Sequence, residues 1–429
     1  MSHYRQFSTW CTAWTLALSI SLATAAEPRE LPTSSPESVG MSSDGLAKVS
    51  ESLQGFVDED KVAGAIAIVV RKGKVVYFEA FGSRDIEGKK PMEKDSILRF
   101  YSMTKPITTV AAMILVEEGK LQLDDDIATY IPEFKDLKVF DSKEGDQFKV
   151  KDLERPVTIR DLMRHTSGLT YGLFGNTAID QHYRQAGVLT PTNSLQQMAE
   201  KLGTIPLLYQ PGTRFNYSVS TDVLGHVVEL ISGKNLGDFF QQRILGPLDM
   251  TDTAFQVPKN SVDRFGPTYG PAADGGLEVD EEVATSRFIR TPVMCSGGGG
   301  LVSTARDYSR FCQMILNRGK LDGNRILKAA TVQNMTRNQL PESAIPIVLG
   351  LPRPGVGFGL GFSVVVSNPG PSSNRRLGEV GWGGAASTHF WISQKDELVV
   401  VVLSQREPFT QQLEVAIKPL VYEAIQEYP

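Results

Sequence analysis

Residues 103–118 (MTKPITTVAAMILVEE) are apolar on nearly every face of the helix that their composition favours. A helix that is apolar all round is buried, so other elements of the chain must cover it on every side. Gly119 supplies a stop, and Pro106 is tolerated only in the first turn, where its missing N–H has no intrahelical partner. We therefore expect a buried helix that begins near Ser102.

Two β-hairpin patterns lie at opposite ends of the chain. Residues 63–82 contain two β-branched runs around a turn at Gly73, and residues 388–405 read as strand, polar turn and strand. A further strand pattern, FGLGFSVVVS, covers residues 358–367. Hairpin neighbours are antiparallel, so these patterns predict one antiparallel sheet built from both ends of the chain.

Helical patterns flank and separate these strands. Ser42 or Ser43 caps a helix that runs through Leu46, and residues 409–428 have apolar spacing that suits a helix covering one face of the sheet. Four more helical patterns, most of them ending in Gly, lie between the strand-rich ends, at residues 157–169, 193–203, 221–233 and 236–248.

These patterns together predict an α/β (α+β) fold with a central antiparallel sheet flanked by helices. Residues 27–135 and 290–429 are expected to form an α/β domain that contains the sheet. Residues 136–289 are expected to form a mostly helical domain inserted into it. Such a junction between lobes is a frequent place for a cleft.

The first 26 residues have the features of a secretory signal peptide. Arg5 precedes an apolar, Ser/Thr-diluted run, and Ala23 and Ala25 form an A-x-A pattern ahead of charged sequence. The alternative, a membrane anchor, needs a run of about 17–25 apolar residues, and this run is at or below that length. We expect export to the periplasm or medium, with cleavage near Ala25 or Ala26 and no stable membrane insertion afterwards.

Composition excludes some partners. The chain of 429 residues is 41% hydrophobic with a net charge of −5, and its Lys and Arg are scattered, which argues against a nucleic-acid partner. Its five histidines show no metal-ligand spacing, so we expect neither a metal nor a cofactor. After signal removal Cys295 and Cys312 remain, either as a disulfide or as free thiols. The oligomeric state is left open.

Ser102 and Lys105 stand three positions apart at the start of the buried helix. An i, i+3 pair shares one helix face, and the helix N-terminus stabilises negative charge that develops beside the serine oxygen. A partly desolvated lysine has its neutral form favoured and can then take the serine proton, which permits acyl transfer through a covalent ester. In the alternative reading Ser102 is a helix cap and Lys105 is solvated. A Ser-His-Asp triad is disfavoured because the G-x-S-x-G elbow is absent from the sequence.

Three motifs in order resemble the serine β-lactamase and penicillin-binding protein superfamily, and within it the class C-like esterases called family VIII carboxylesterases. They are Ser102-Met103-Thr104-Lys105, Tyr217 in FNYSVSTDVLGHVVE, and Trp382-Gly383-Gly384 in GEVGWGGAASTHFWI. LMRHTSGL and CSGGGGLVSTARDYSRF are also similar to segments of this superfamily, and the resemblance covers residues 27–429. It implies a β-lactamase-like fold.

The resemblance also implies roles for the motif residues. Tyr217, which alone would be an ordinary core tyrosine, would point at the nucleophile from the start of a capped helix at Ser218. The glycines Gly383 and Gly384, which alone would mark a turn or bulge, would let substrate approach, and the N–H groups of Ser102 and Ala385 would form an oxyanion hole.

Two departures from the β-lactamase pattern bear on the substrate. Val219 stands where β-lactamases carry Asn, and Trp382 stands where they carry Lys or His, so the cation that receives the lactam carboxylate is missing. The pocket is therefore expected to prefer neutral esters of short to medium acyl chains. Weak lactam turnover is compatible with this expectation, because the nucleophile and oxyanion hole would be the same. Tyr101, Tyr171 and Phe174 are further candidates for its lining.

The resulting hypothesis is a carboxylesterase for small-molecule esters, with Ser102 as the nucleophile and Lys105 and Tyr217 sharing the general acid and base work. Which of the two is the base for acylation is open. The alternatives are a β-lactamase, a D-alanyl carboxypeptidase or a transesterase with the same site. A catalytically silent binding protein is disfavoured because both the S-x-x-K and the Tyr elements are intact.

Overall fold

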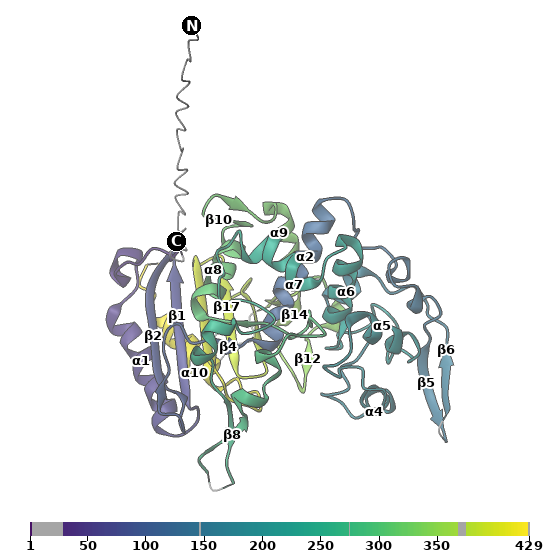
Figure 1. Ribbon diagram of the computed structural model, residues 1–429, viewed down its shortest axis with the longest axis horizontal. Helices are drawn as coiled ribbons and strands as arrows, with labels where there is room; N and C mark the ends of the chain where they lie inside the picture. The colour runs from purple at the N-terminus through teal and green to yellow at the C-terminus, as the bar shows by residue number, and fades with distance from the viewer. Residues whose placement is uncertain (2–28, 146, 274, 368–374, 428–429) are drawn as a thin grey trace.

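The computed structural model describes Met1 and residues 29–145, 147–273, 275–367 and 375–427 (Figure 1). Apart from Met1, the expected signal peptide at residues 1–26 lies outside these described residues. Within them, no helix has the length and apolar character needed to cross a membrane.

An eight-stranded antiparallel sheet forms the framework, in the order β14-β15-β16-β17-β18-β1-β2-β3. Its strands are β1 (Gly64–Arg71), β2 (Lys74–Asp85), β3 (Lys90–Pro91), β14 (Val356–Phe358), β15 (Ser363–Val365), β16 (Val380–Gly384), β17 (Thr388–Ser393) and β18 (Leu398–Ser404). Strand β1 pairs with β18 from Ala65 opposite Ser404 to Arg71 opposite Leu398. The prediction of one antiparallel sheet built from both ends of the chain is therefore confirmed.

The turn between β1 and β2 shows why the first hairpin was recognisable. Lys72 and Gly73 both have a left-handed backbone, with φ of 50° and 74°. Two successive residues of this kind make the two-residue turn whose twist matches that of the paired strands. The sequence signal at Gly73 and the β-branched flanks thus act together.

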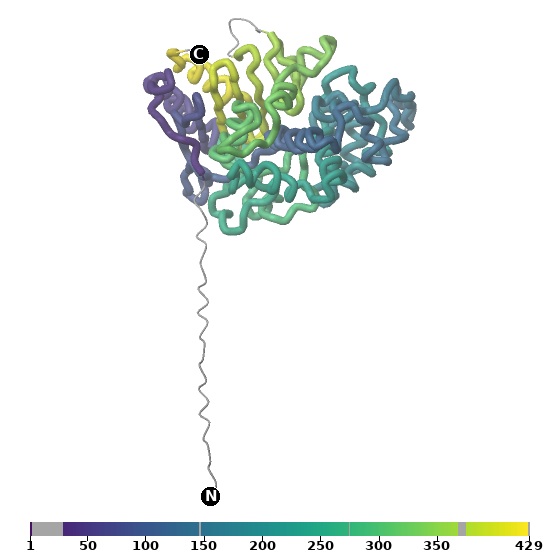
Figure 2. The backbone as a smooth tube through the Cα atoms, turned by 90° about the horizontal axis from the view of Figure 1, so that it is seen from above, coloured from purple at the N-terminus to yellow at the C-terminus, as the bar shows by residue number. Residues whose placement is uncertain are grey.

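Helices cover both faces of the sheet. The ten helices among the described residues are α1 (Ser43–Asp58), α2 (Thr104–Glu117), α3 (Ile159–Met163), α4 (Ala178–Gln185), α5 (Leu195–Gly203), α6 (Ser220–Ser232), α7 (Leu236–Phe240), α8 (Ala305–Leu316), α9 (Ala329–Met335) and α10 (Gln412–Glu423). One core cluster joins α1 and α10 to alternate side chains of β1 and β18, and the purple and yellow segments that carry them lie side by side in Figure 2. The opposite face of the same strands packs on α8, and its side chains belong to the same core cluster as those of α2.

Helix α2 has the burial that its sequence requires. All its residues from Thr104 to Leu115 are buried, and Gly119 follows with a left-handed φ of 71°. A 3₁₀ turn, Tyr101–Met103, precedes it. The prediction of a central helix that starts near Ser102 is correct.

Other helix predictions were too long. The pattern at 157–169 yields only α3, because the chain turns left-handed at His165 (φ 56°) and Gly168 (φ 85°). In 236–248, α7 gives way to a π-helical turn at Gln241–Leu245. The expected cap at Ser218 is absent, since α6 has Val219 at its N-cap without a side-chain hydrogen bond. The last helix is shorter than 409–428.

Short two-stranded sheets complete the described elements. They are β4 (Leu98–Arg99) with β9 (Val302–Ser303), β5 (Val139–Glu144) with β6 (Gln147–Lys151), β7 (Thr268–Pro271) with β8 (Leu277–Glu281), β10 (Lys320–Leu321) with β11 (Asn324–Arg325), and β12 (Val348–Leu349) with β13 (Leu351–Pro352). The hairpins β5–β6 and β7–β8 interrupt the stretch 136–289, for which helices were expected.

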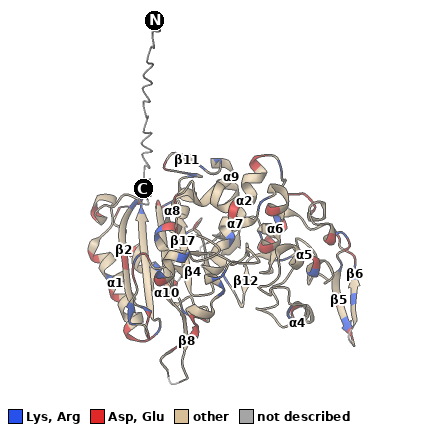
Figure 3. Ribbon diagram, in the orientation of Figure 1, with Lys and Arg blue, Asp and Glu red and all other residues tan. Residues whose placement is uncertain are grey.

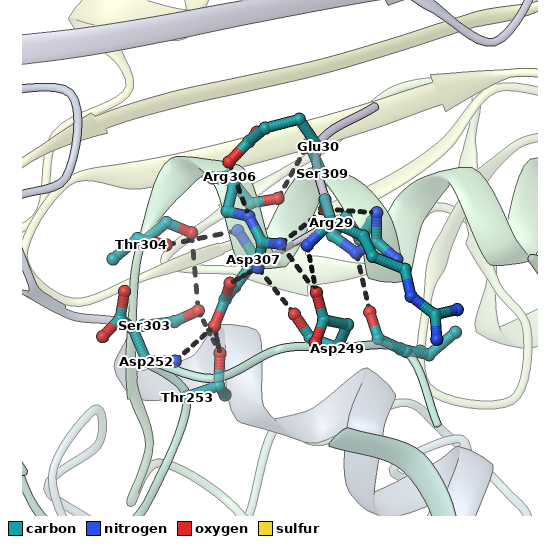
Figure 4. Close-up of polar contacts among 12 residues, drawn as sticks. Arg29, Glu30, Asp249, Asp252, Thr253, Ser303, Thr304, Arg306, Asp307 and Ser309 are labelled. Carbon is teal, nitrogen blue, oxygen red and sulfur yellow. Dashed lines mark hydrogen bonds and ion pairs between the residues drawn. The ribbon is translucent and has the colours of Figure 1, made fainter. Parts of the chain in front are cut away.

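A buried polar network anchors the start of α8 (Figure 4). Arg306 donates to Asp307 Oδ1 at 2.7 Å and to Asp249 Oδ2 at 3.0 Å, and Thr253 Oγ donates to Asp307 Oδ2 at 2.9 Å. Ser303, in β9, bonds to Thr253 in turn. Because β9 pairs with β4, the network fixes the strand that leads into the Tyr101–Met103 turn.

The surface carries charges of both signs. Figure 3 shows Lys and Arg interspersed with Asp and Glu along the helices and strands. Among the described residues, no group of His, Cys, Asp and Glu is arranged to hold a metal ion. Cys295 and Cys312 are free thiols, and burial raises the pKa of both, that of Cys295 to about 11.

Candidate active site

Ser102 lies in the Tyr101–Met103 turn, between β4 and α2. Tyr101 has a φ of 42°, a left-handed conformation that is uncommon and costly for a bulky non-glycine residue and that recurs at active sites. Its phenol donates to Glu407 Oε1 at 3.0 Å, and its ring packs on Phe288 at 5.7 Å between centroids. These contacts hold the backbone that presents Ser102, whose side chain is partly exposed.

Lys105 follows one turn later and is 1% exposed. Its Nζ donates to Ser102 Oγ at 3.2 Å, to Tyr171 OH at 3.0 Å and to the Gly298 carbonyl at 2.6 Å. Three acceptors match the three N–H donors of a lysine side chain. The alternative reading, a solvated Lys105 with Ser102 as a helix cap, is wrong, because Lys105 is buried and the N-cap of α2 is Met103.

Tyr217 lies just before α6, and its ring centroid is 4.6 Å from Lys105 Nζ. Its hydroxyl accepts a hydrogen bond from Trp382 Nε1 at 3.3 Å. Within the described residues it makes no hydrogen bond to Ser102 or Lys105. The structure therefore brings the serine, the lysine and the tyrosine together, and within the described residues the Tyr217 hydroxyl donates no hydrogen bond.

Tyr171 makes the contact with Lys105 that the motif analysis did not assign. Burial, then Asp222 and Tyr217, raise the pKa of Tyr171 well above its ordinary value, so it stays a neutral phenol. The sequence marked this residue only as a candidate lining residue. It stands in a loop after α3, where no local pattern signals proximity to Lys105.

Asp222, on α6, supports the third acceptor of Lys105. Its fully buried carboxylate accepts from Ser296 Oγ at 2.5 Å and from the Gly298 N–H at 3.0 Å through Oδ1. Oδ2 has no partner within the described residues. A Cβ on Gly298 would lie 2.3 Å from Oδ2 and 2.9 Å from Tyr171 OH, so only glycine fits there.

Strand β16 brings the glycine motif alongside the Tyr101–Met103 turn. A Cβ on Gly384 would lie 2.2 Å from the Phe100 carbonyl, so this close approach requires glycine. The N–H groups of Ser102 and Ala385 donate no hydrogen bond within the described part of the chain. Both are available to an incoming oxyanion.

Aromatic rings enclose these polar groups. Trp382 is 7% exposed and packs on Tyr217 at 5.4 Å and on Phe358 at 5.1 Å, and Phe174 packs on Tyr217 at 5.7 Å. Of the other candidate lining residues, Tyr101 is turned toward Glu407.

The histidines do not complete a serine triad. His165 is buried beside Tyr217 and contacts Ser218 Oγ through Nδ1 at 3.3 Å. Burial and the charge of Lys105 hold the pKa of His165 well below its ordinary value. Its imidazole is therefore neutral and serves as a packing group. His389 pairs in register with Gly383 and contacts the Thr410 carbonyl at 3.0 Å and Glu414.

Fold and site define an enzyme of the β-lactamase-fold hydrolase and acyltransferase kind. The chain belongs to the beta-lactamase family, whose model matches residues 49–418. It is 36% identical to Protein Rv1367c of Mycobacterium tuberculosis, covering 83% of this chain and 89% of that one. It is 30% identical to lovastatin esterase of Penicillium rubens (80% and 89%) and 29% identical to esterase EstB of Burkholderia gladioli (85% and 92%).

Solved structures agree on the fold. The chain matches EstCE1, described as a hydrolase with promiscuous acyltransferase activity, with a TM-score of 0.78 and 28% identity over 88% of this chain and 99% of that one. Simvastatin synthase LovD of Aspergillus terreus matches with a TM-score of 0.76 and 23% identity over 90% and 98%. The predicted β-lactamase-like fold and the resemblance to this superfamily are confirmed.

Proposed function

We propose that the protein is a carboxylesterase of the family VIII type, which hydrolyses esters of short to medium acyl chains through an acyl-enzyme on Ser102. The observation that carries the proposal is the contact of Lys105 Nζ with Ser102 Oγ at 3.2 Å, with the Tyr217 ring 4.6 Å from the same nitrogen. Nucleophile and proton-transfer groups within reach of each other are what acyl transfer requires.

In the proposed reaction the Lys105–Tyr217 pair begins with one proton fewer than an ammonium and a phenol carry together, the vacancy being on either residue. Ser102 Oγ attacks the ester carbonyl carbon, and its proton fills that vacancy. The N–H groups of Ser102 and Ala385 hold the oxyanion. The same pair returns the proton to the leaving alcohol as the C–O bond breaks. Water then attacks the acyl-serine carbonyl carbon and gives a proton to the pair. The pair passes that proton to Ser102 Oγ as the acyl C–O bond breaks, which releases the acid and restores the Ser102 hydroxyl.

Tyr171 and the Gly298 carbonyl would act through Lys105. Both are hydrogen-bonded to its Nζ, and Asp222 fixes Gly298 through its N–H. They are positioning groups, because a lysine held by three acceptors keeps its nitrogen at one distance from Ser102.

The first test compares wild type with Ser102→Ala on 4-nitrophenyl butyrate. We expect the variant to lose about 10³-fold or more in kcat, because the members of a catalytic unit fail together. Mass spectrometry after a fluorophosphonate probe should place the adduct on the Ser102 peptide. Turnover at the original rate by folded Ser102→Ala would disprove the assignment. Nitrocefin turnover that exceeds ester turnover would make the protein a β-lactamase instead.

Acyl transfer to an alcohol is the second candidate. Support comes from the likeness to EstCE1 and from 27% identity to monacolin J acid methylbutanoyltransferase of Aspergillus terreus. Adding an alcohol acceptor to an ester assay and measuring the partition between acid and new ester distinguishes the two. A dominant new ester would identify a transferase.

We also propose that residues 1–26 direct export and are removed near Ala25 or Ala26. Support is the charged start, the apolar run and the A-x-A pattern. Mass spectrometry of the exported protein measures the mature N-terminus. Full-length protein retained inside the cell would contradict the proposal.

A further inference from the structure

The rings of Trp382, Tyr217, Phe358 and Phe174 form an aromatic wall beside Ser102. Arg353 brings a positive charge to this wall from a segment that carries none of the motifs described above. Arg353 follows the hairpin β12–β13, and its guanidinium carbon lies 5.7 Å from the centroid of the Trp382 ring. The side chain is partly buried. It makes no hydrogen bond or ion pair within the described residues, although a guanidinium carries five N–H donors. Such a group is costly to hold away from water without an acceptor.

The charged groups around Arg353 do not neutralise it directly. Burial lowers its pKa, Glu414 and Tyr217 oppose that shift, and Arg375 reinforces it. Glu414 already accepts from Lys418 at 2.7 Å and contacts His389 at 3.4 Å. The chain as a whole is negative, with a net charge of −5, so this cation is a local feature of the wall.

Trp382 connects Arg353 to the nucleophile. Its Nε1 donates to Tyr217 OH, and the Tyr217 ring lies beside Lys105, which contacts Ser102. A substrate seated on the Trp382 ring would therefore have its carbonyl near Ser102 and its far end near Arg353.

Large apolar side chains are exposed near Arg353 and near Tyr217. Leu351 is 78% and Val348 50% exposed on β12–β13, next to Arg353 in the chain. Phe174 is 66% exposed although its ring packs on Tyr171 and Tyr217. Large apolar side chains left in water at the rim of a site suit a substrate with an apolar body.

We propose that the site takes esters whose acyl part ends in a carboxylate, and that this carboxylate pairs with Arg353 while the chain between lies on Trp382. The inference rests on the proposed esterase function and narrows its substrate class. Guanidinium and carboxylate match in a two-point hydrogen bond that is stronger than a neutral one. The expectation from Trp382 alone was a preference for neutral esters, and Arg353 supplies a cation from another part of the chain.

The test uses matched esters that differ in one charge: 4-nitrophenyl hydrogen adipate and 4-nitrophenyl hexanoate. The readout is the ratio of their kcat/KM values. We expect Arg353→Met, which keeps an apolar stem, to lower the adipate-to-hexanoate ratio about ten- to a hundredfold, the loss of one charge-assisted hydrogen bond. Arg353→Lys should restore part of it. An unchanged ratio, or equal loss on both esters, would overturn the inference.

The matched control is Arg318→Met. Arg318 is exposed and lies beside the turns at Lys72–Gly73 and Gln394–Glu397, just past the last residue of β17. Gly384 pairs with Thr388 at the other end of that strand. The Arg318→Met substitution removes one positive charge, as Arg353→Met does, but far from Ser102. The adipate-to-hexanoate ratio of kcat/KM should therefore stay within about twofold of wild type. A fall equal to that of Arg353→Met would assign the effect to overall charge and refute a local subsite.

A binding measurement separates this inference from the esterase proposal. Titration calorimetry of monobutyl adipate and of butyl hexanoate into Ser102→Ala needs no turnover. We expect tighter binding of the anionic ester, lost in Ser102→Ala/Arg353→Met. If wild type cleaved neither ester but adipate still bound through Arg353, the esterase proposal would fall and the anion subsite would stand. Equal binding of both ligands would remove the subsite.

Discussion

At the scale of single residues, the site depends on how one buried lysine is held. Lys105 has three acceptors from three separate segments: Ser102 beside α2, Tyr171 in the loop after α3, and Gly298 in a glycine-rich loop. The S-x-x-K spacing predicted only the first of these contacts, because it is set by the helix. The other two depend on tertiary packing that no local pattern records.

Tyr171→Phe should therefore impair catalysis. The change removes one acceptor of Lys105 Nζ and leaves the ring in place, and a hydrogen bond to a charged group contributes about 1.5–3 kcal/mol. We expect kcat/KM on 4-nitrophenyl butyrate to fall about tenfold or more, and Tyr217→Phe to cause a larger loss. Tyr130→Phe, whose hydroxyl donates to Asp125 on another part of the surface, is the control. Full activity in Tyr171→Phe would exclude a positioning role.

Asp222→Ala should loosen the loop that contains Gly298. It removes the shared acceptor of Ser296 Oγ and the Gly298 N–H, which are then left unpaired in a buried place. The expected loss is about 3 kcal/mol in the free energy of unfolding, measured by urea denaturation, together with slower ester turnover. Asp222→Asn, which keeps an acceptor oxygen, should lose less stability. Equal stability of wild type and Asp222→Ala would contradict this account.

At the scale of elements, the strand that carries Trp382 is tied to α10 by a buried ionic network. Lys418 Nζ donates to Glu379 Oε1 and Glu414 Oε1, both at 2.7 Å, and Tyr422 donates to Glu379, the residue before β16. Lys418 is only 4% exposed. Breaking a buried pair by removing one partner leaves an uncompensated charge, so the network should matter for stability.

The pKa shifts give the pH window of this network. Burial alone would raise the pKa of Glu414, but Lys418 and His389 hold it well below its ordinary 4.5, so its contribution is present above about pH 4.5 and is lost in acid. Burial alone would lower the pKa of Lys418, but Glu379 and Glu414 raise it above 10.5, so its contribution is present below about pH 10.5 and is lost in alkali.

Lys418→Met should destabilise the protein by about 3–5 kcal/mol at pH 7, measured by urea unfolding. At pH 4 the deficit should shrink, because Glu414, which has then lost its Lys418 partner, can take up a proton. Lys94→Met is the control, since Lys94 and Glu79 form a pair that is 49% exposed on both sides and should contribute less than about 1 kcal/mol. The same deficit at both pH values would argue against an electrostatic origin.

The sequence predicted elements well where the signal is local. The hairpin at Gly73 and the apolar helix at 104–117 are set by neighbouring residues, so their patterns were sufficient. The pattern at 157–169 failed because His165 adopts a left-handed conformation within it. Arg353 was missed for another reason: it lies in a loop region without periodicity, and its place beside Trp382 arises only when distant segments pack.

At the scale of the whole molecule, the sheet joins strands that are far apart in the sequence. β1 pairs with β18, and the N–H of Gln426 donates to the Gly40 carbonyl at 2.9 Å. The proposed active site is also built from distant segments, because Ser102 and Lys105 precede the β5–β6 hairpin, whereas Tyr217 and Trp382 follow it. A complete site therefore needs segments from both sides of that hairpin.

The two fragments produced by a cut at the β5–β6 turn should therefore stay associated. The residues flanking this turn, Glu144, Gly145 and Gln147, are exposed, and the hairpin projects from the molecule in Figure 1, so an inserted protease site should be accessible without disturbing the core. After cleavage the earlier fragment still provides β1 to β3 and α2, held by β18 and α6 of the later one. We expect the fragments to co-elute in gel filtration and to retain ester turnover close to that of the uncut insertion variant, separating only in denaturant. Fragments that part under native conditions would show that the shared sheet and core do not hold the molecule together.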